Sequence, residues 1–475
     1  MNRIQPMKVL LLLCYAYGML FTVAPIQASE AKRNTSAAPN FLIIITDDQR
    51  YDGMSCAGNS ILKTPNIDRI AEGGMRFTNA FVTQSLCAPS RACILTGKYS
   101  HANGVLKNSS RWKRQPILTD TLHEAGYESA YIGKCHKGTN LLKTKFTHWL
   151  GFNGQGAYHD MGLLDFDGKK VTSKAHTTGR LADLAVTYLE KHCKSPFCLF
   201  LAFKAPHIPY EADSKYTSAF SDAQIPYPPN WDEGTKNRPN AVKVAPQVKD
   251  LDFVKGRYRL LLGVDAAVGK LLDSLTRLNL DENTVIIFTS DNGFFHGEFK
   301  LWNKRFMYEP SIRVPLLIKY PKLISETKTH DAMTLNIDLA PTILDLAGRH
   351  SDEMQGRSLE PLLTNKDVPW PKDFYYAYYE HAKKNSSISD NGIRIGAAPA
   401  HRGIRTERYK YIEYYLGRPF GSNEPNYELL DMLKDPHEQK NLYDNPEYHT
   451  VLKDLRARMA AIRKETNDPT INAEQ

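Results

Sequence analysis

Long hydrophobic runs are almost absent from this sequence of 475 residues. The one such run extends from Val9 to Val23, follows two basic residues and precedes small residues near Ala28. It is short for a membrane span, which needs about 20 apolar residues, and its position is typical of a secretory signal. We predict a signal peptide over residues 1–28, no stable membrane insertion after its cleavage, and export to a periplasmic, extracellular or lumenal location. A retained N-terminal anchor is the alternative.

Cysteine is also scarce, with seven residues, one of them inside the signal run. Cys87 stands in a motif described below, and the other five are an odd number, which argues against a disulfide framework. Cys193 and Cys198 bracket a short turn where a local bridge is possible. The rest are predicted to be packed thiols: Cys56, Cys93 and Cys135.

Charge of one sign does not dominate, because 61 Lys and Arg face 52 Asp and Glu, a formal net charge of +9. The basic residues are scattered rather than arranged as a stripe, so we predict no nucleic-acid partner. The excess suits an anionic substrate, although an ordinary mixed surface explains it equally well.

Short apolar runs alternate with helical patterns along most of the chain. The runs cover 40–45, 196–203, 284–289 and 314–319, and apolar residues recur at three- and four-residue spacing from 260 to 278. Such alternation predicts an α/β fold, with a large mixed, mainly parallel sheet sandwiched by helices.

Prolines at 361, 369 and 371 mark a boundary, beyond which the chain is rich in tyrosine and charged residues. Alternating patterns beyond them predict antiparallel strands at 403–406 and 409–412, followed by a helix over 446–464. We therefore predict a flexible leader over 29–38, a catalytic α/β domain over 39–365, and a smaller C-terminal α+β subdomain over 366–475 with an antiparallel sheet.

Oxygen-bearing side chains follow two of the predicted strands. Asp47 and Asp48 come after the first run, and Asp291 and Asn292 come after the run that ends at Ser290. Ligands collect at the carboxyl ends of strands in α/β sheets. Hard oxygen donors without His or Cys favour Ca²⁺, with Mg²⁺ as second choice, over Zn²⁺. Taken alone, Asp47 and Asp48 are also compatible with a helix N-cap pair.

Residues 87–97 read C-x-P-S-R-x-x-x-L-T-G, which resembles the maturation and active-site signature of the type I sulfatases. The resemblance implies that a formylglycine-generating maturation enzyme oxidises Cys87 to formylglycine (3-oxoalanine). Hydrated, this aldehyde offers one hydroxyl to attack sulfur and a second whose deprotonation expels sulfate. It also implies metal ligation by Asp47, Asp48, Asp291, Asn292 and the modified Cys87, with Arg91 anchoring the hydrate. A buried helix start with Cys87 as a core thiol is the alternative.

Two further segments resemble family motifs. Gly133-Lys134-Cys135-His136 is similar to G-K-x-H, which implies that Lys134 holds sulfate and His136 takes a proton during elimination. The x position is commonly tryptophan in the family, so Cys135 is a departure. Pro206-His207-Ile208-Pro209 is similar to P-H-x-P, which implies that His207 helps to protonate the leaving alcohol.

The segment from Lys304 to Glu309 has the family spacing K-x-x-x-x-E, which implies that Lys304 binds sulfate and shares the general-acid role; Lys300 is the rival. Phe299 stands where many relatives have histidine, and phenylalanine there occurs in the glucosamine-6-sulfatase-like branch. The substrate-binding candidates are His296, His401 and Arg405. The last two lie in a tyrosine-rich region, where aromatic faces and cationic groups suit a sulfated sugar. Packing of the tyrosines within a sheet explains their number equally well.

Residues 427–442 resemble the family hallmark Y-E-L-Y-D-x-x-x-D-P-x-E-x-x-N-L, for which we predict a structural role. The leading hypothesis is hydrolysis of sulfate esters on a sulfated carbohydrate, such as a polysaccharide or a glycosaminoglycan-type oligosaccharide. Two alternatives stay open: a phosphonate or phosphate ester hydrolase of the same superfamily (the alkaline phosphatase superfamily), and a non-catalytic calcium-dependent glycan-binding protein.

Overall fold

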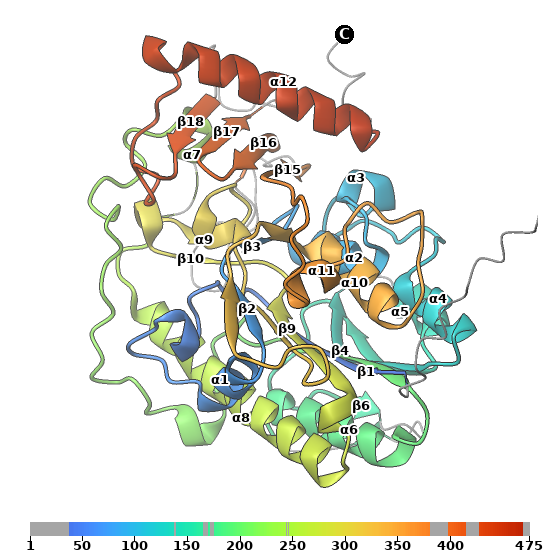
Figure 1. Ribbon diagram of the computed structural model, residues 1–475. Coiled ribbons are helices and arrows are strands. Elements are labelled where there is room, and N and C mark those ends of the chain that lie inside the picture. The colour runs from blue at the N-terminus through green and yellow to red at the C-terminus, as the bar shows by residue number, and fades with distance from the viewer. Residues whose placement is uncertain are drawn as a thin grey trace, which may run out of the picture. The chain divides into compact units, whose positions relative to one another are not determined.

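An eight-stranded mixed sheet lies at the centre of the molecule, in the order β13-β2-β12-β9-β1-β8-β4-β5 (Figure 1). The computed structural model describes residues 38–136, 139–164, 170–171, 175–243, 245, 247–380, 398–414 and 427–468. The sheet strands are β1 (Asn40–Thr46), β2 (Met75–Phe77), β4 (Glu128–His136), β5 (His148–Asn153), β8 (Phe197–Ala202), β9 (Thr284–Ser290), β12 (Leu316–Lys319) and β13 (Lys328–His330). The strands from β9 to β5 run parallel, whereas β12 is antiparallel to both β9 and β2.

The central strand β1 is buried on both faces. Phe41, Ile43 and Ile45 belong to one hydrophobic cluster, and Leu42 and Ile44 belong to another. Successive side chains of a strand point to opposite faces of the sheet, so an uninterrupted apolar run fits a strand that lies between two covering layers.

Helices supply those two layers. One face is covered by α1 (Pro65–Glu72), α6 (Thr177–His192) and α8 (Asp252–Arg277), whose apolar residues join the cluster of Leu42. The other is covered by α2 (Cys87–Thr96), α4 (Leu118–Glu124) and α10 (Leu339–Leu346), which join the cluster of Phe41. Figure 1 shows the two groups on opposite sides of β1 and β9. Shorter helices are α3 (Ser100–Asn103), α5 (Thr139–Leu142), α7 (Asn240–Lys243), α9 (Glu309–Ile312) and α11 (Glu360–Leu363).

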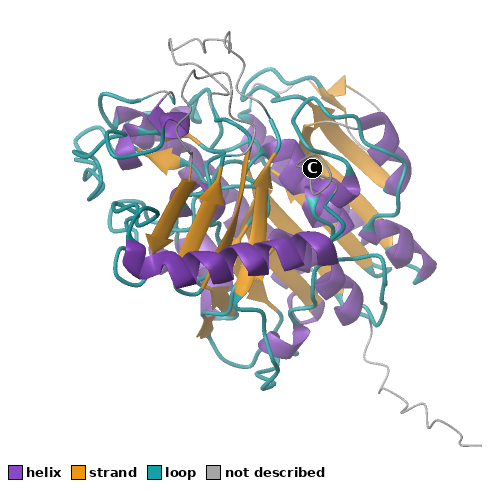
Figure 2. Ribbon diagram, turned by 90° about the horizontal axis from the view of Figure 1, so that it is seen from above, coloured by secondary structure: helices purple, strands orange, loops and turns teal. Residues whose placement is uncertain are grey.

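A second, antiparallel sheet follows near the C-terminus in the order β15-β16-β17-β18. Its strands are β15 (Asp373–Tyr378), β16 (His401–Thr406), β17 (Tyr409–Glu413) and β18 (Tyr427–Asp431), and α12 (His449–Glu465) lies across them (Figure 2). Two-stranded ribbons complete the described strands: β3 (Ala80–Phe81) with β14 (Thr334–Leu335), β6 (Leu163–Leu164) with β7 (Lys170–Val171), and β10 (Phe295–His296) with β11 (Trp302–Asn303). The predicted fold class is therefore confirmed. The boundary predicted at 365–366 falls between α11 and β15 and stays a prediction.

Buried carboxylates join the second sheet to the rest of the chain. Glu428 on β18 accepts hydrogen bonds from Arg238 Nη1 at 3.0 Å, from the hydroxyl of Tyr308 at 2.7 Å and from that of Tyr414 at 2.9 Å. A carboxylate can be buried at low cost only when its oxygens are paired in this way. The hallmark segment thus fixes the residues near position 308, which lead into α9.

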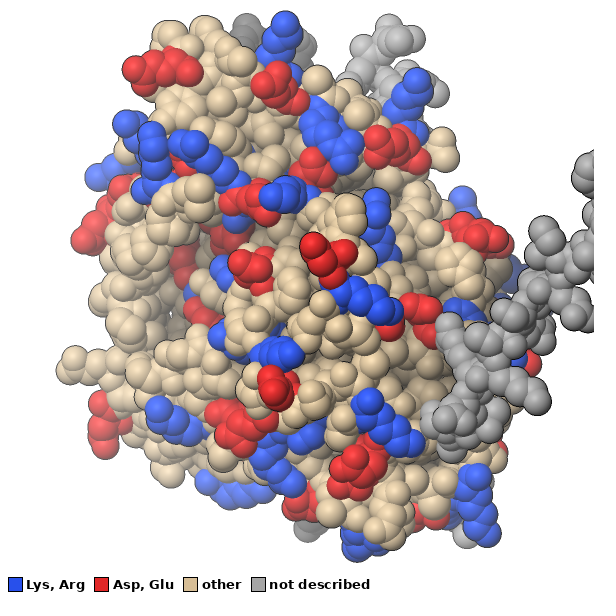
Figure 3. All heavy atoms as spheres, viewed as in Figure 1, with Lys and Arg blue, Asp and Glu red and all other residues tan. Residues whose placement is uncertain are grey.

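Several predictions from the sequence concern the surface, the termini and the cysteines. Among the helices that the structure describes, none combines the length and apolarity needed to cross a membrane. The predicted signal peptide and all but the last residue of the leader lie outside the described residues. Lys and Arg are interspersed with Asp and Glu on the face shown in Figure 3. Cys193 and Cys198 are free thiols, so the possible local bridge is absent from the described part of the chain.

Gly133 on β4 is a position that only glycine fits. Its φ is 106°, and a Cβ there would collide with the backbone oxygen of Ala202 on the neighbouring strand β8. We expect Gly133→Ala to lower the free energy of unfolding by about 2–4 kcal/mol, from backbone strain and overpacking combined. Urea unfolding followed by circular dichroism measures the loss.

Gly126→Ala is the matched control, because Gly126 also has a positive φ, 82°, but has open space around it. Backbone strain alone predicts a loss of about 1–2 kcal/mol there. Equal losses in the two variants would show that the contact between β4 and β8 is not as tight as the structure has it.

Candidate active site

The carboxyl ends of β1 and β9 place two acidic segments side by side. The strands are paired in parallel register, with Thr46 opposite Ser290, so Asp47 and Asp291 leave the sheet at the same edge. The backbone nitrogen of Asp48 donates a hydrogen bond to Asp291 Oδ1 at 3.1 Å. All three carboxylates are buried. The chain therefore concentrates negative charge in the interior, at the edge of the sheet where ligands bind.

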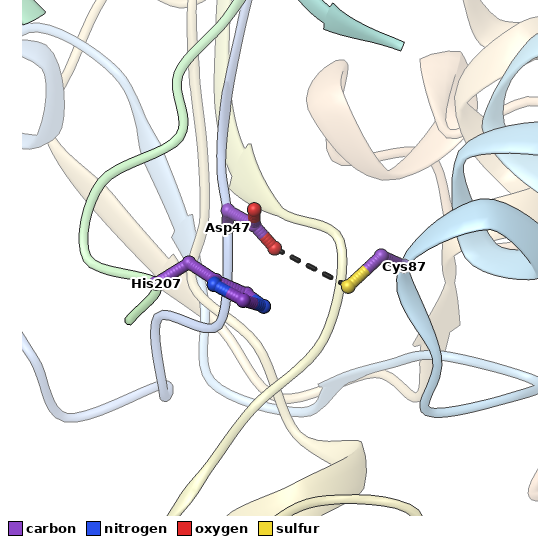
Figure 4. A group of neighbouring side chains, drawn as sticks. All are labelled: Asp47, Cys87 and His207. Atoms are coloured by element: carbon purple, nitrogen blue, oxygen red, sulfur yellow. Dashed lines mark hydrogen bonds between the residues drawn. The ribbon is translucent and has the colours of Figure 1, made fainter. Parts of the chain in front are cut away.

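Cys87, the first residue of the fully buried helix α2, points at these carboxylates. Its Sγ lies 3.3 Å from Asp47 Oδ1 and 4.0 Å from Asp48 Oδ1, and Figure 4 shows Cys87 and His207 turned toward Asp47. Burial and the charge of Asp47 raise the pKa of the Cys87 thiol to about 12. The thiolate is the nucleophilic form of cysteine, so the unmodified side chain is a weak nucleophile at neutral pH.

Arg91 lies one helical turn after Cys87 and connects three elements. Its Nε donates a hydrogen bond to Asp291 Oδ2 at 2.8 Å, and its Nη1 donates one to the backbone oxygen of Lys134 at 2.6 Å. Burial alone would lower the pKa of Arg91, but the carboxylate of Asp291 raises it above its usual value. The guanidinium therefore stays charged and holds α2 against the ends of β4 and β9.

Lys134 and His136 occupy the carboxyl end of β4. Lys134 Nζ contacts the carboxylate of Asp47 and donates a hydrogen bond to Gln155 Oε1 at 2.5 Å. Nδ1 of His136 has no hydrogen-bond partner among the described residues. Burial and the charge of Lys134 lower the pKa of His136 to about 2. Its imidazole is therefore neutral at physiological pH.

His207 lies on the loop after β8, on the other side of Asp47 (Figure 4). Its Nδ1 is 2.8 Å from the backbone oxygen of Ile208. A carbonyl oxygen can only accept, so Nδ1 carries the proton and Nε2, 3.8 Å from Asp48 Oδ2, is the basic nitrogen. Burial and Lys134 lower the pKa of His207 to about 3. The hydroxyl of Tyr158 donates to the backbone oxygen of His207 at 2.6 Å and fixes the loop.

Lys304 completes the cluster from the loop between β11 and α9. Its Nζ contacts the carboxylate of Asp48 and lies 3.1 Å from Cys87 Sγ. Burial opposes a charge on Lys304, but Asp48 outweighs it and raises the pKa of the amine above its usual value. Lys300, the rival candidate, lies instead with its Nζ 5.5 Å from the ring centroid of Trp231.

A scan against family models adds independent information. The model described as Sulfatase matches residues 39–349, and the model described as the C-terminal part of N-sulphoglucosamine sulphohydrolase matches residues 297–465. The first match covers well over half of the chain. The chain belongs to the sulfatase family. It is therefore a sulfuric ester hydrolase, and the resemblance noted from its sequence motifs is confirmed.

Individual relatives of this sulfatase are carbohydrate sulfatases by name. An N-acetylglucosamine-6-O-sulfatase of Bacteroides thetaiotaomicron is 33% identical over 97% of this chain and 92% of its own length. An ulvan-active sulfatase of Formosa agariphila is 28% identical over 89% of this chain and 80% of its own length. A solved structure described as a complex with its substrate D-glucosamine-2-N,6-O-disulfate superposes with a TM-score of 0.78 at 30% identity, covering 91% of this chain and 99% of the other.

The three substrate-binding candidates of the sulfatase lie outside this cluster. His296 accepts a hydrogen bond from Arg257 Nε at 3.0 Å and lines a cavity of about 450 Å³, and Arg257 Nη2 contacts the backbone oxygen of Asp48. His401 is fully buried among aromatic rings. Arg405 donates to Glu309 Oε1 at 3.0 Å inside a buried ion-pair network. Their roles in substrate binding stay predictions.

Sequence reasoning missed two polar residues near the site. Lys204 is buried beside Tyr158, and burial together with the charge of Lys134 lowers the pKa of its amine to about 8. Its position two residues beyond the end of β8 was a usable signal, because it leaves the sheet at the same edge as Asp47. Gln155, the partner of Lys134, follows β5 in a loop and carries no such signal.

The donor atoms fit a divalent cation. Four residues each place one oxygen or sulfur atom within 4.8 Å of the others: Asp47, Asp48, Cys87 and Asp291. Asn292 donates from Nδ2 to Asp48 Oδ1 at 2.7 Å, while its buried Oδ1 has no hydrogen-bond partner in the described part of the chain. A buried amide oxygen left unpaired is costly, and a hard cation is the ligand that these oxygens suit.

Removal of one oxygen tests this fit. We expect Asn292→Ala to weaken Ca²⁺ binding by about tenfold or more, since even indirect support of a metal ligand contributes about 10–100-fold to affinity. Isothermal calorimetry of the chelator-treated protein gives the affinity without any need for turnover. We also expect chelation to lower the melting temperature, because the cation binds only the folded chain.

Asn103→Ala is the control, because Asn103 is also buried but hydrogen-bonds to the backbone oxygen of Lys98, away from the carboxylates. It should bind Ca²⁺ like the unchanged protein. Unaltered affinity in Asn292→Ala would remove Asn292 from the ligand set.

Proposed function

We propose that this sulfatase hydrolyses the 6-O-sulfate ester of a glucosamine-type unit in a sulfated carbohydrate, releasing sulfate and the free sugar hydroxyl. The observation that best supports sulfate ester hydrolysis is the position of Cys87 Sγ, which lies within hydrogen-bonding distance of Asp47 and of Lys304. A nucleophile at this point lies between an ammonium group that can bind an anion and a carboxylate that can hold a cation. The names of the N-acetylglucosamine-6-O-sulfatase and of the glucosamine disulfate complex support the choice of sugar and position.

The proposal includes conversion of Cys87 to formylglycine by a maturation enzyme. Hydrated formylglycine supplies two hydroxyls on one carbon. The unmodified thiol has no second group of this kind, and with a pKa of about 12 it is also a weak nucleophile at neutral pH. Because Cys87 is fully buried on a buried helix, a maturation enzyme can reach it only before the chain has folded. We therefore place the modification during or before folding.

A bound Ca²⁺, with Mg²⁺ as second choice, belongs to the same proposal. Asp47, Asp48, Asp291, Asn292 and the modified residue 87 would hold it, and it would supply neutralisation of the charge that develops on the sulfate oxygens. The oxygen-rich ligand set supports this choice, because Zn²⁺ prefers nitrogen and sulfur.

The remaining residues bind sulfate and move protons. Lys134 and Lys304 direct ammonium groups at the site and would hold the sulfate oxygens. His136, neutral with a basic nitrogen, would accept the proton from the hydroxyl of residue 87 when sulfate leaves. His207 would help to protonate the leaving sugar oxygen through Nε2, because its Nδ1 is engaged with Ile208. Nε2 would first take up a proton when the anionic substrate is bound, and Lys304, whose amine stays protonated, would share the general-acid role.

The regiochemistry rests on the relatives rather than on Phe299. This residue is buried, and the guanidinium of Arg238 lies 4.2 Å from its ring centroid. It therefore marks a local packing arrangement with Arg238. For location, the apolar run near the N-terminus supports export to a periplasmic, extracellular or lumenal compartment, as proposed from the sequence.

A substrate panel tests the proposal. We expect the matured protein with Ca²⁺ to release sulfate from 6-O-sulfated N-acetylglucosamine or glucosamine at least about 100-fold faster than from 2-O-, 3-O- or 4-O-sulfated sugars, a discrimination of about 2.7 kcal/mol in the transition state. Ion chromatography measures sulfate, and mass spectrometry confirms the aldehyde at residue 87. Cys87→Ala is the inactive control.

The panel also separates the alternatives. An aryl phosphate or phosphonate hydrolysed faster than every sulfate ester would favour the phosphoester hydrolase. Binding of sulfated glycans without turnover, despite a confirmed aldehyde, would favour the glycan-binding protein. Release from another position with no release from the 6-O-sulfates would overturn the regiochemistry alone.

The proposed role of His136 as a proton acceptor can be tested separately. We expect His136→Ala to lower kcat by about 10²–10⁴-fold, the usual contribution of general acid–base catalysis, while KM changes little because sulfate is held by the lysines. Steady-state kinetics on the best substrate gives both constants. His123→Ala, which removes a histidine on α4 that bonds to Ser129, is the control and should retain full activity; an equal loss there would contradict a specific role.

A further inference from the structure

Two histidines and a glutamate meet at the edge of the sheet opposite to the sulfatase site. Glu128 is the first residue of β4, His148 is the first of β5, and His192 is the last of α6. β4 also carries His136 at its other end. The nine residues of β4 span eight steps of about 3.3 Å, so its two ends are about 26 Å apart. This cluster is therefore independent of the catalytic groups.

The donor atoms have the spacing of a tetrahedral zinc site. Oε2 of Glu128 lies 2.9 Å from His192 Nδ1 and 3.5 Å from His148 Nε2, and each of the three residues has a donor atom within 4.8 Å of a donor atom of the other two. Ligand atoms that are about 2.0–2.2 Å from a tetrahedral zinc are about 3.3–3.6 Å apart. The distance of 3.5 Å falls within that range and the distance of 2.9 Å is a few tenths of an ångström shorter, so a cation requires only small side-chain movements.

The scaffold behind the cluster is rigid. The fully buried Tyr188 packs against both imidazoles, with ring centroids 5.5 Å from His148 and 4.8 Å from His192. Strands β4 and β5 are paired in register directly beside the cluster, with Ala130 opposite His148. Both rings are therefore held by packing against regular elements rather than by a loop, as a preformed metal site requires.

We propose that Glu128, His148 and His192 form a second metal site, for Zn²⁺ or a similar borderline divalent ion, which links α6 to β4 and β5. Two imidazoles and one carboxylate are a common zinc ligand set, and they leave a fourth position for water. The side chains are 22–36% exposed, which gives the ion a path from solvent. Ca²⁺ does not suit this site, because it prefers six or more oxygen ligands.

Zinc binding to the tag-free full chain tests the site. The Cys87→Ala background removes the thiol through which zinc could enter the catalytic cluster. In this background we expect one zinc per chain after dialysis, measured by elemental analysis, and a rise in melting temperature on addition of Zn²⁺. Co²⁺ should give the intense visible bands of a tetrahedral or five-coordinate site.

Substitutions in the same background assign the ligands. His192→Gln and His148→Gln should each raise the zinc Kd by at least about 100-fold, since loss of a ligand exceeds the 10–100-fold effect of losing a supporting group. His123→Gln should leave it unchanged, because this neighbouring histidine bonds to Ser129 outside the cluster. Circular dichroism confirms folding of each variant. Absence of bound zinc, or zinc binding that neither glutamine variant weakens, would overturn the proposal.

Discussion

The compensation of buried charge at the ends of β1 and β9 is the constraint on which the rest of the sulfatase site depends. Asp47, Asp48 and Asp291 are buried together, and unpaired charges in such a position would be very costly. Lys134, Lys304 and Arg91 each contact one of these carboxylates. Since the three cations come from β4, the loop before α9 and α2, the charge pairing also brings together the elements that carry the chemistry.

The C-terminal sheet contributes to this arrangement through the loop that carries Lys304. Lys304 lies five residues before Glu309, whose carboxylate is 2.9 Å from Lys410 Nζ and 3.0 Å from Arg405 Nε. Lys410 in turn pairs with Glu438 at 2.5 Å. The hallmark segment near the C-terminus and Arg405 therefore act on the position of Lys304. This explains why a segment without catalytic groups accompanies the sulfatase motifs.

Both ends of the parallel strands are polar, but their chemistry differs. The carboxyl ends carry oxygen donors and ammonium groups, which suit a hard cation and an anionic ester. The amino ends of β4 and β5, with the last turn of α6, carry two imidazoles and one carboxylate, which suit a borderline metal. One sheet can thus hold two ions of different character, because β4 is long enough to keep their ligands well apart.

The sequence by itself determined the α/β class, the central strands and the residues proposed to carry the chemistry. Continuous apolar runs such as 40–45 and 284–289 can be buried only between two layers, and the motifs around Cys87, Lys134 and His207 retain their spacing whatever the surroundings. β4 was missed as a strand, because Ser129, Gly133 and Lys134 interrupt its apolar pattern. Only the tertiary structure decided that Lys304 rather than Lys300 reaches Cys87. It also decided that Lys204 and Gln155 lie at the site and that His401 is enclosed by aromatic rings. These outcomes depend on contacts between segments up to about 250 residues apart, and no local pattern encodes the geometry of such contacts.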